Sequence, residues 1–239
     1  MNPDPLYSVV VPFYNEAENL PQLVREIDAM LRVMEQPAEI ILVDDGSTDT
    51  FAQPAGSPAF PIRWLSISQN SGQSAAMYYG MQSARGPYII LMDADLQNDP
   101  MDAINMLRKL ESEELDLVTG VRLKRNDNFI RRLSSSIANS VRSALLQDRT
   151  SDTGCTLKVI RREPAQRLPG WNGMHRFIPA LVLSAGYKIG EMPVSHRARH
   201  AGISKVAGGK RAMRATVDLL GMLWFSRRQF KGRLLEKKT

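Results

Sequence analysis

The stretch Ile89-Ile90-Leu91-Met92-Asp93-Ala94-Asp95-Leu96-Gln97-Asn98-Asp99-Pro100 passes from four apolar residues directly into carboxylates, amides and a proline. A short apolar run that ends abruptly in polar residues is typical of a buried β-strand followed by a loop. Asp99 and Pro100 suit the N-cap and the first turn of a following helix. The polar groups that this local reading leaves unexplained are Asp93, Asp95 and Gln97.

The first half of the chain repeats this alternation of apolar strand and amphipathic helix. Strands are predicted at 7–12, 39–43, 62–67, 88–92 and 115–119, and helices at 20–34, 74–84 and 100–113. Strands separated by helices predict an α/β fold with a mainly parallel sheet covered on both faces. Ligands of such sheets bind beyond the carboxyl ends of the strands. Three of the predicted strands run into Asn15-Glu16, Asp44-Asp45 and Asp93-Ala94-Asp95, so we expect these groups to meet at one edge.

Composition sets outer bounds on the class of protein. With 239 residues, 43% hydrophobic and 23% charged, the chain can bury the core of one globular domain. The single cysteine, Cys155, excludes an internal disulfide and a multi-cysteine zinc site. The sequence shows neither a signal-peptide pattern nor an apolar run of the roughly 20 residues that span a bilayer. We therefore expect the chain to remain on one side of any membrane.

Charge is divided unevenly along the chain. The net charge is +6, but residues 1–119 hold 6 lysines and arginines against 18 aspartates and glutamates, a balance of −12. Residues 120–239 hold 25 against 7, a balance of +18. Such asymmetry indicates that the second half meets an anionic partner, for which nucleic acid, phosphate groups and acidic lipid headgroups are the candidates.

Asp93 and Asp95 have two interpretations from the residues alone. Two carboxylates two positions apart can face one point if the loop turns, and Mg²⁺ is commonly bound by one or two carboxylates while substrate phosphates complete its shell. Gln97 could add a carbonyl oxygen. The alternative is that these side chains are solvated loop residues.

Five segments of the chain resemble family 2 glycosyltransferases with the GT-A fold, and among them the dolichyl- and polyprenyl-phosphate sugar synthases, such as the dolichol-phosphate mannosyltransferases. In order along the chain they are Val10-Val11-Pro12-Phe13-Tyr14-Asn15-Glu16, Val43-Asp44-Asp45-Gly46-Ser47-Thr48-Asp49, Asn70-Ser71-Gly72-Gln73, Met92-Asp93-Ala94-Asp95-Leu96-Gln97 and Arg199-His200-Ala201-Gly202-Ile203-Ser204-Lys205. The resemblance covers about residues 6–207, which predicts a catalytic domain over 1–207 and a basic tail over 208–239.

The resemblance implies a role for each matching residue. The donor nucleotide would be surrounded by Pro12, Tyr14, Glu16, Val43, Asp45, Gln73 and Ala94, with Arg199, Ser204 and Lys205 over its phosphates. Asp93, Asp95 and Gln97 would hold Mg²⁺ or Mn²⁺ against the donor diphosphate. The phosphate of a polyprenyl acceptor would lie near Arg122, Arg131 and Ser135, and Asp152 would orient or deprotonate the acceptor.

The implied reaction is inverting transfer of a sugar from a nucleoside-diphosphate sugar, UDP-linked in preference to GDP-mannose, to a polyprenyl phosphate for cell-envelope or lipid A glycans. A phosphate monoester is mostly ionised at neutral pH and needs no strong base. The alternatives are transfer to a hydroxyl group, a dinucleotide-dependent oxidoreductase, and a non-catalytic basic module that binds membranes or nucleic acid. No Gly-x-Gly-x-x-Gly follows the first strand and no interleaved aromatic and basic RNA motif appears, so we expect no nucleic-acid partner.

The segment 212–225 has apolar and basic residues on different sides of a predicted helix, with Arg227, Arg228, Lys231 and Arg233 after it. This pattern favours a helix that lies on a membrane surface. The alternative is that the helix packs on the protein's own core. The first interpretation predicts peripheral attachment to the cytoplasmic face of the inner membrane, with an integral membrane partner as a further hypothesis, and the second a cytoplasmic enzyme.

Overall fold

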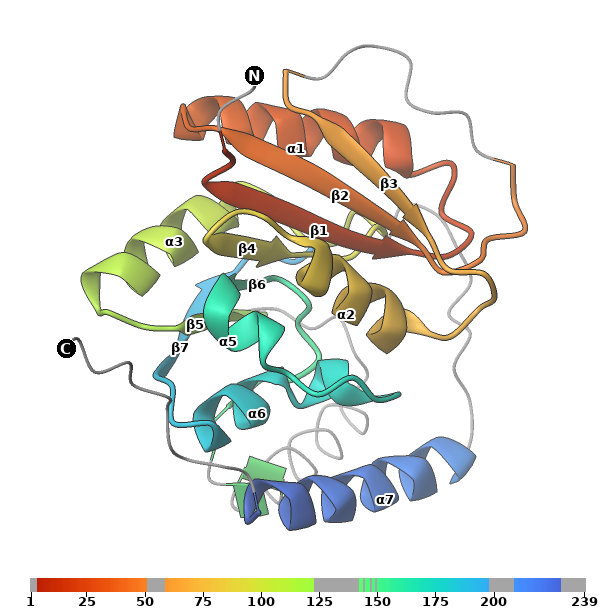
Figure 1. Cartoon of the computed structure of the whole chain (residues 1–239), viewed down its shortest axis with the longest axis vertical. Coiled ribbons are helices and arrows are strands. Elements are labelled where there is room, and N and C mark those ends of the chain that lie inside the picture. The colour runs from red at the N-terminus through yellow and green to blue at the C-terminus, as the bar shows by residue number, and fades with distance from the viewer. Residues whose placement is uncertain are drawn as a thin grey trace, which may run out of the picture.

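The computed structural model describes residues 4–50, 59–122, 142–143, 145–146, 148, 150–197 and 209–228. These residues form a seven-stranded sheet with the strand order β3-β2-β1-β4-β6-β5-β7, shown in Figure 1. The strands are β1 (Tyr7–Phe13), β2 (Ala38–Asp44), β3 (Ile62–Ser66), β4 (Tyr88–Leu91), β5 (Leu117–Arg122), β6 (Lys158–Arg161) and β7 (Ile189–Val194). The mainly parallel α/β sheet predicted from the sequence is confirmed.

Helices cover both faces of this sheet. They are α1 (Leu20–Met34), α2 (Gln73–Ser83), α3 (Asp102–Ser112), α5 (Arg162–Gln166), α6 (Ile178–Ser184) and α7 (Gly209–Ser226), with the 3₁₀ turn η1 (Met174–Arg176). The buried apolar side chains of α1 and α3 belong to one cluster, and those of α2, α5, η1 and α6 belong to another. Figure 1 shows α7 at the far end of the molecule from α1.

The two clusters follow from the period of two in the strands, whose successive side chains point to opposite faces. In β1, Val9 and Val11 belong to the cluster under α1, whereas Val10 belongs to the one under α2. All seven residues of β1 and of β2 are buried. This two-sided burial explains why these strands read as continuous apolar runs rather than as alternating ones.

One strand runs against the others. β6 is antiparallel to both of its neighbours, β4 and β5, while every other pairing in the sheet is parallel. Lys158, the first residue of β6, is therefore paired with Leu91, the last residue of β4. The reversal brings the segment before β6 to the edge of the sheet where the other strands end.

The packing of α2 on the sheet depends on a glycine. A Cβ atom added at Gly80 would collide with Val10 Cγ1 and would lie 3.1 Å from Val43 Cγ2. Gly221 in α7 is a matched contrast, because it is exposed and an added Cβ would meet no atom within 4 Å. The close approach of α2 to β1 and β2 thus requires a residue without a side chain at position 80.

We expect Gly80→Val to lower the free energy of unfolding by about 1–3 kcal/mol, because the added atoms overpack a filled core. Gly221→Val should change it by less than about 0.5 kcal/mol, as is usual for exposed positions. Urea unfolding of the two variants beside the wild type measures both values. Equal effects of the two substitutions would contradict the close packing of α2.

Candidate active site

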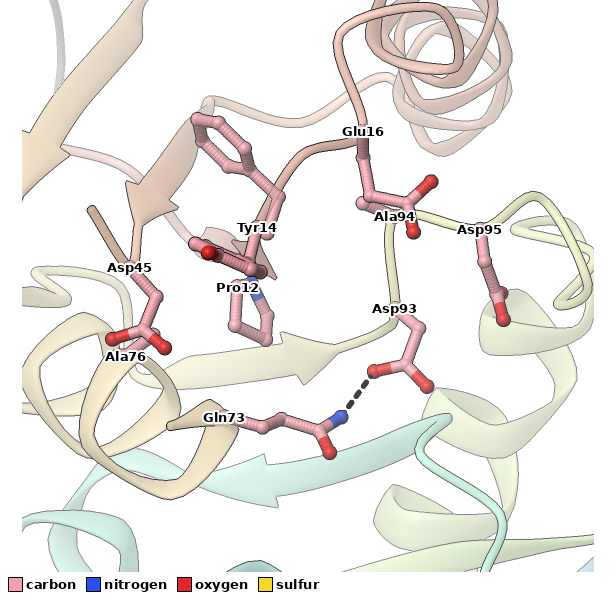
Figure 2. Close-up of a pocket in the computed structure, with 10 residues that line it drawn as sticks. Pro12, Tyr14, Glu16, Asp45, Gln73, Ala76, Asp93, Ala94 and Asp95 are labelled. Carbon is pink, nitrogen blue, oxygen red and sulfur yellow. Dashed lines mark hydrogen bonds between the residues drawn. The ribbon is translucent and has the colours of Figure 1, made fainter. Parts of the chain in front are cut away.

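A pocket opens at the carboxyl edge of the sheet, where β1, β2 and β4 end. Its lining comes from the loops after these strands and from the start of α2, as Figure 2 shows. The lining residues are Pro12, Phe13, Tyr14, Glu16, Asp45, Gln73, Ala76, Asp93, Ala94 and Asp95. Eight of these ten were predicted from the sequence as donor- or metal-binding residues, and the structure brings them together around one cavity.

Asp45 lies on one side of the pocket and is 3% exposed. Its carboxylate accepts hydrogen bonds from the backbone N–H groups of Ser71 and Gly72, both at 2.8 Å. Gly72 has a positive φ of 90° and immediately precedes α2. The carboxylate thereby fixes the turn into α2, and this turn places Gln73 with its amide directed at Asp93 (Figure 2).

The carboxylate of Asp93 is held from two directions. Gln73 Nε2 donates to Oδ1 at 2.6 Å, and Thr156 Oγ1 donates to Oδ2 at 2.7 Å. Burial and the adjacent charge of Asp95 raise the pKa of Asp93 to about 6, against the opposing effect of these hydrogen bonds. The two carboxylates are therefore close enough for their negative charges to repel each other.

The loop after β4 turns sharply between its polar residues. Leu96 has a φ of 60°, an uncommon value for a residue with a side chain, and is 2% exposed. The turn buries Leu96 in the core under α1 and α3 while Asp95 and Gln97 both line a cavity. Asp99 accepts a hydrogen bond from the backbone N–H of Met101 at 3.1 Å. It therefore fixes the turn before α3, whose N-cap is Met101 rather than the predicted Asp99.

A second, smaller cavity shares Asp93 and Asp95 with the first. Its lining residues are Asp93, Asp95, Gln97, Asn98, Arg122, Gly154, Cys155, Thr156 and His196. Its volume of about 30 Å³ equals the space of roughly one water molecule. The two carboxylates thus lie on the boundary between the donor-side pocket and a cavity that an arginine and a histidine line.

Arg122, at the end of β5, is oriented by Asp152. Its Nε donates to Asp152 Oδ2 at 2.7 Å and its Nη2 donates to Oδ1 at 2.8 Å. The two side chains are 16% and 8% exposed, and the backbone N–H of Gly154 adds a third hydrogen bond to the carboxylate. This two-pronged geometry fixes the plane of the guanidinium at the wall of the second cavity. The predicted role of Asp152 toward the acceptor stays a prediction.

A lysine lies underneath the carboxylates. Lys158 is 1% exposed, and its ammonium group donates to the backbone carbonyl of Cys155. Burial lowers the pKa of Lys158, while Cys155, Asp93 and Asp152 act in the opposite direction. The hydrogen bond ties down the segment that carries Thr156. The thiol of Cys155 is buried as well, and burial raises its pKa, which is the environment of an inert structural cysteine.

The remaining predicted site residues do not line the first pocket. Val43 is fully buried in the core under α2, and Gln97 and Arg122 line the second cavity. Arg131, Ser135, Arg199, Ser204 and Lys205 lie outside the described residues, so their roles stay predictions.

Sequence reasoning missed several residues that the structure brings to the site. Thr156, Asn98 and His196 line the second cavity, and Phe13 and Ala76 line the first pocket. Asn98 forms an isolated β-bridge with His196, and Gln97 Nε2 lies 3.4 Å from His196 Nε2. No comparable signal marks Thr156 in the sequence, because it precedes the short run Leu157-Lys158-Val159-Ile160, whereas the predicted site residues follow their strands.

The fold and the site together are typical of proteins with the GT-A fold. The sheet has the GT-A arrangement, and a carboxylate pair lies at the carboxyl edge of its strands. The most similar solved structures include glucosyl-3-phosphoglycerate synthase from Mycobacterium tuberculosis in complex with Mn²⁺, UDP-glucose and phosphoglyceric acid. It has a TM-score of 0.68 and 18% identity, and the match covers 93% of this chain and 80% of that one. At this identity the likeness supports the fold alone.

The chain belongs to glycosyl transferase family 2, whose family model matches residues 8–168. Dodecaprenyl-phosphate galacturonate synthase of Rhizobium johnstonii is 40% identical over 227 residues, which is 92% of this chain and 67% of the relative. Undecaprenyl-phosphate 4-deoxy-4-formamido-L-arabinose transferase of Pseudomonas fluorescens is 35% identical over 211 residues, 86% of this chain and 62% of the relative. The family resemblance seen in the sequence is confirmed, and this chain spans about two thirds of the length of these relatives.

We expect Asp152→Ala to lower the free energy of unfolding by about 1–3 kcal/mol, because it removes the carboxylate that accepts two hydrogen bonds from the largely buried guanidinium of Arg122. The double variant Arg122→Ala/Asp152→Ala should be more stable than the sum of the single effects predicts, by about 0.5–3 kcal/mol. Urea unfolding of the four proteins measures this coupling energy. Additive single effects would show that the ion pair does not hold the cavity wall.

Proposed function

We propose that this chain transfers a sugar, with inversion at the anomeric carbon, from a nucleoside-diphosphate sugar to a polyprenyl phosphate. The observation that carries the proposal is the position of Asp93 and Asp95 on the boundary between two cavities, one at the nucleotide edge of the sheet and one lined by Arg122. The names of the two relatives support a polyprenyl-phosphate acceptor. UDP is the favoured nucleotide, and the products would serve cell-envelope or lipid A glycans.

On the donor side, the pocket supplies what a nucleoside requires. Pro12, Phe13 and Tyr14 provide apolar surface, while Glu16 and Asp45 are acidic groups that can accept hydrogen bonds from the base or the ribose. Because Asp45 is fixed by Ser71 and Gly72, its position is set before any ligand enters. A preorganised acceptor of this kind costs little entropy on binding.

A divalent cation fits the carboxylate pair. The described residues contain no cluster of three or more His, Cys, Asp or Glu side chains that could hold a metal by themselves. Mg²⁺ and related hard cations commonly take one or two carboxylates and complete their shell with substrate phosphates, and two desolvated carboxylates that repel each other provide such a pair. Both side-chain hydrogen bonds of Gln97 involve its amide nitrogen, so its side-chain carbonyl oxygen could act as a third ligand of the cation.

When bound, the cation would neutralise the negative charge that develops on the departing diphosphate. The protein's own part is to hold the two carboxylates in one place. Gln73 and Thr156 fix both oxygens of Asp93, and the turn at Leu96 directs Asp95 toward the same cavity. These contacts restrict the movement of both carboxylates, so little reorganisation would accompany the reaction.

On the acceptor side, Arg122 would bind the phosphate of the lipid. Its guanidinium plane is set by Asp152, and planar guanidinium groups match phosphate oxygens well. An ionised phosphate monoester is its own nucleophile, so the acceptor needs cations and orientation rather than a strong base. Arg131 and Ser135 would complete the phosphate site, and Arg199, Ser204 and Lys205 would cover the donor.

The acceptor proposed here is a membrane lipid, so the chain would work at a bilayer surface, at the cytoplasmic face of the inner membrane. No helix among the residues that the structure describes is long and apolar enough to cross a membrane. Because the acceptor is a lipid, peripheral attachment, with or without an integral membrane partner, is part of the proposal.

Metal binding gives the first test of the site. We expect Asp93→Asn and Asp95→Asn each to weaken Mn²⁺ binding in the presence of UDP by at least about tenfold, because each removes a charged ligand. Asp99→Asn is the matched control, since its side chain can keep the hydrogen bond to Met101 N–H. Isothermal titration calorimetry measures the affinities. Undiminished Mn²⁺ binding by both site variants would overturn the metal assignment.

Transfer of radiolabelled sugar from a panel of nucleotide sugars to a short-chain polyprenyl phosphate tests the reaction itself. The wild type should transfer sugar from a UDP-sugar, and Asp95→Ala should lower the rate by about 10²-fold or more, because charge on the leaving group is no longer stabilised. NMR of the product should show the inverted anomeric configuration. Transfer to a hydroxyl acceptor but not to the phosphate, or full activity of the variant, would contradict the proposal.

A further inference from the structure

Helix α7 has two apolar sides, and within the part of the chain that the structure describes only one of them packs against the body of the protein. Asp218, Leu219, Met222 and Phe225 lie along the side that faces the body. Met222 is 2% exposed, and Asp218 Oδ2 accepts a hydrogen bond from Arg176 Nη2 at 2.6 Å, an ion pair that joins α7 to η1. The alternative that this helix packs on the core is thus correct for one of its sides.

The opposite side carries a stripe of large apolar residues in solvent. Val217, Leu220 and Trp224 are 62%, 61% and 61% exposed, and their spacing of three and four residues places them on one face. We call these three residues the outer stripe. Residues 218, 222 and 225 lie on the other half of the helical circumference at 100° per residue, so the helix cannot turn to bury the outer stripe without losing Met222 from the core.

Basic residues continue the outer stripe at its carboxyl end. Arg227 and Arg228 are both exposed, and Arg228 Cζ lies 5.1 Å from the centre of the Trp224 ring. Both arginines follow the last residue of α7, and the contact with Trp224 places Arg228 beside the outer stripe. An apolar stripe that includes a tryptophan and ends in arginines is the arrangement of helices that lie in the interface of a bilayer.

We infer that α7 binds flat on the surface of an anionic lipid bilayer through Val217, Leu220 and Trp224, with Arg227 and Arg228 against the lipid phosphates. A second protein surface is a weaker fit, because the net charge of +18 over residues 120–239 favours an extended negative surface. The inference rests on the proposed function for its purpose, since a polyprenyl phosphate lies in such a bilayer. The ion pair of Arg176 with Asp218 would then transmit the orientation of the helix to the catalytic body.

Flotation with vesicles of phosphatidylcholine and phosphatidylglycerol tests this inference on the full chain. The wild type should bind these vesicles, bind pure phosphatidylcholine more weakly, and lose affinity as salt is raised. Leu220→Ser/Trp224→Ser should reduce the partition constant by at least about tenfold, because two buried apolar contacts are lost. Val33→Ser is the matched control, since Val33 on α1 is equally exposed at 60% and should bind as the wild type does.

A second measurement distinguishes insertion of this face from non-specific adhesion. Vesicles with brominated acyl chains should quench tryptophan fluorescence of the wild type. Trp224→Phe should keep its vesicle binding and lose most of the quenching, because Trp64 and Trp171 are packed against the two cores. Quenching that persists in Trp224→Phe, or binding by the serine variant equal to that of the wild type, would overturn the inference. The inference would also be overturned if the wild type did not bind vesicles and instead formed a dimer, seen by light scattering, that the Leu220→Ser/Trp224→Ser variant does not form.

Activity on a water-soluble, short-chain acceptor separates the two proposals. The Leu220→Ser/Trp224→Ser variant should keep wild-type transfer to this acceptor and lose at least about tenfold in rate on a full-length acceptor in vesicles. Vesicle binding without any transfer by the wild type would reject the proposed reaction and leave the binding face standing. Transfer with equal rates on both acceptors for wild type and variant would reject the binding face alone.

Discussion

The carboxylate of Asp93 is the point on which the geometry of the site depends. It accepts hydrogen bonds from Gln73 at the start of α2 and from Thr156 before β6, two segments more than 80 residues apart in the sequence. Both donors oppose the rise in pKa that burial and Asp95 impose. The two hydrogen bonds therefore stabilise the ionised form of the carboxylate, which is the form that a cation would bind.

The antiparallel strand β6 makes this arrangement possible. A parallel strand in its place would start at the opposite edge of the sheet, and the segment before it could not reach Asp93. Because β6 is reversed, Thr156, Cys155 and the buried Lys158 all lie beneath the ends of β4 and β5. The hydrogen bond from Lys158 to the Cys155 carbonyl then fixes the backbone that carries Thr156. The lysine therefore helps to position the hydroxyl group that binds Asp93.

The part of the site that the sequence predicted follows from strand direction. Parallel strands end at one edge, so Glu16, Asp45 and Asp93 had to meet once their strands were recognised. Neither Thr156 nor His196 could be placed in this way, because β6 is only four residues long and no local pattern reports that it is reversed. Val43 was assigned to the nucleotide through the family resemblance, whereas the alternation along β2 points it into the core under α2. The sequence offered two alternatives for α7. The structure shows that one side packs on the core through Met222, whereas contact of the other side with a membrane stays a prediction.

Under the proposed function, the division of charge between the two halves of the chain indicates which ligands each half binds and which of them should bind together. Asp93 and Asp95, in the acidic half, repel a diphosphate as long as no cation lies between them, so cation and donor should bind together. Arg122, in the basic half, and the arginines at the end of α7 both favour anions, the first the acceptor phosphate and the second the lipid surface around it. Under the proposed function the basic half would contact the lipid surface on one side and the carboxylate pair on the other. The carboxyl end of β4, which carries that pair, and the end of β5, which carries Arg122, are where the two ligands would meet.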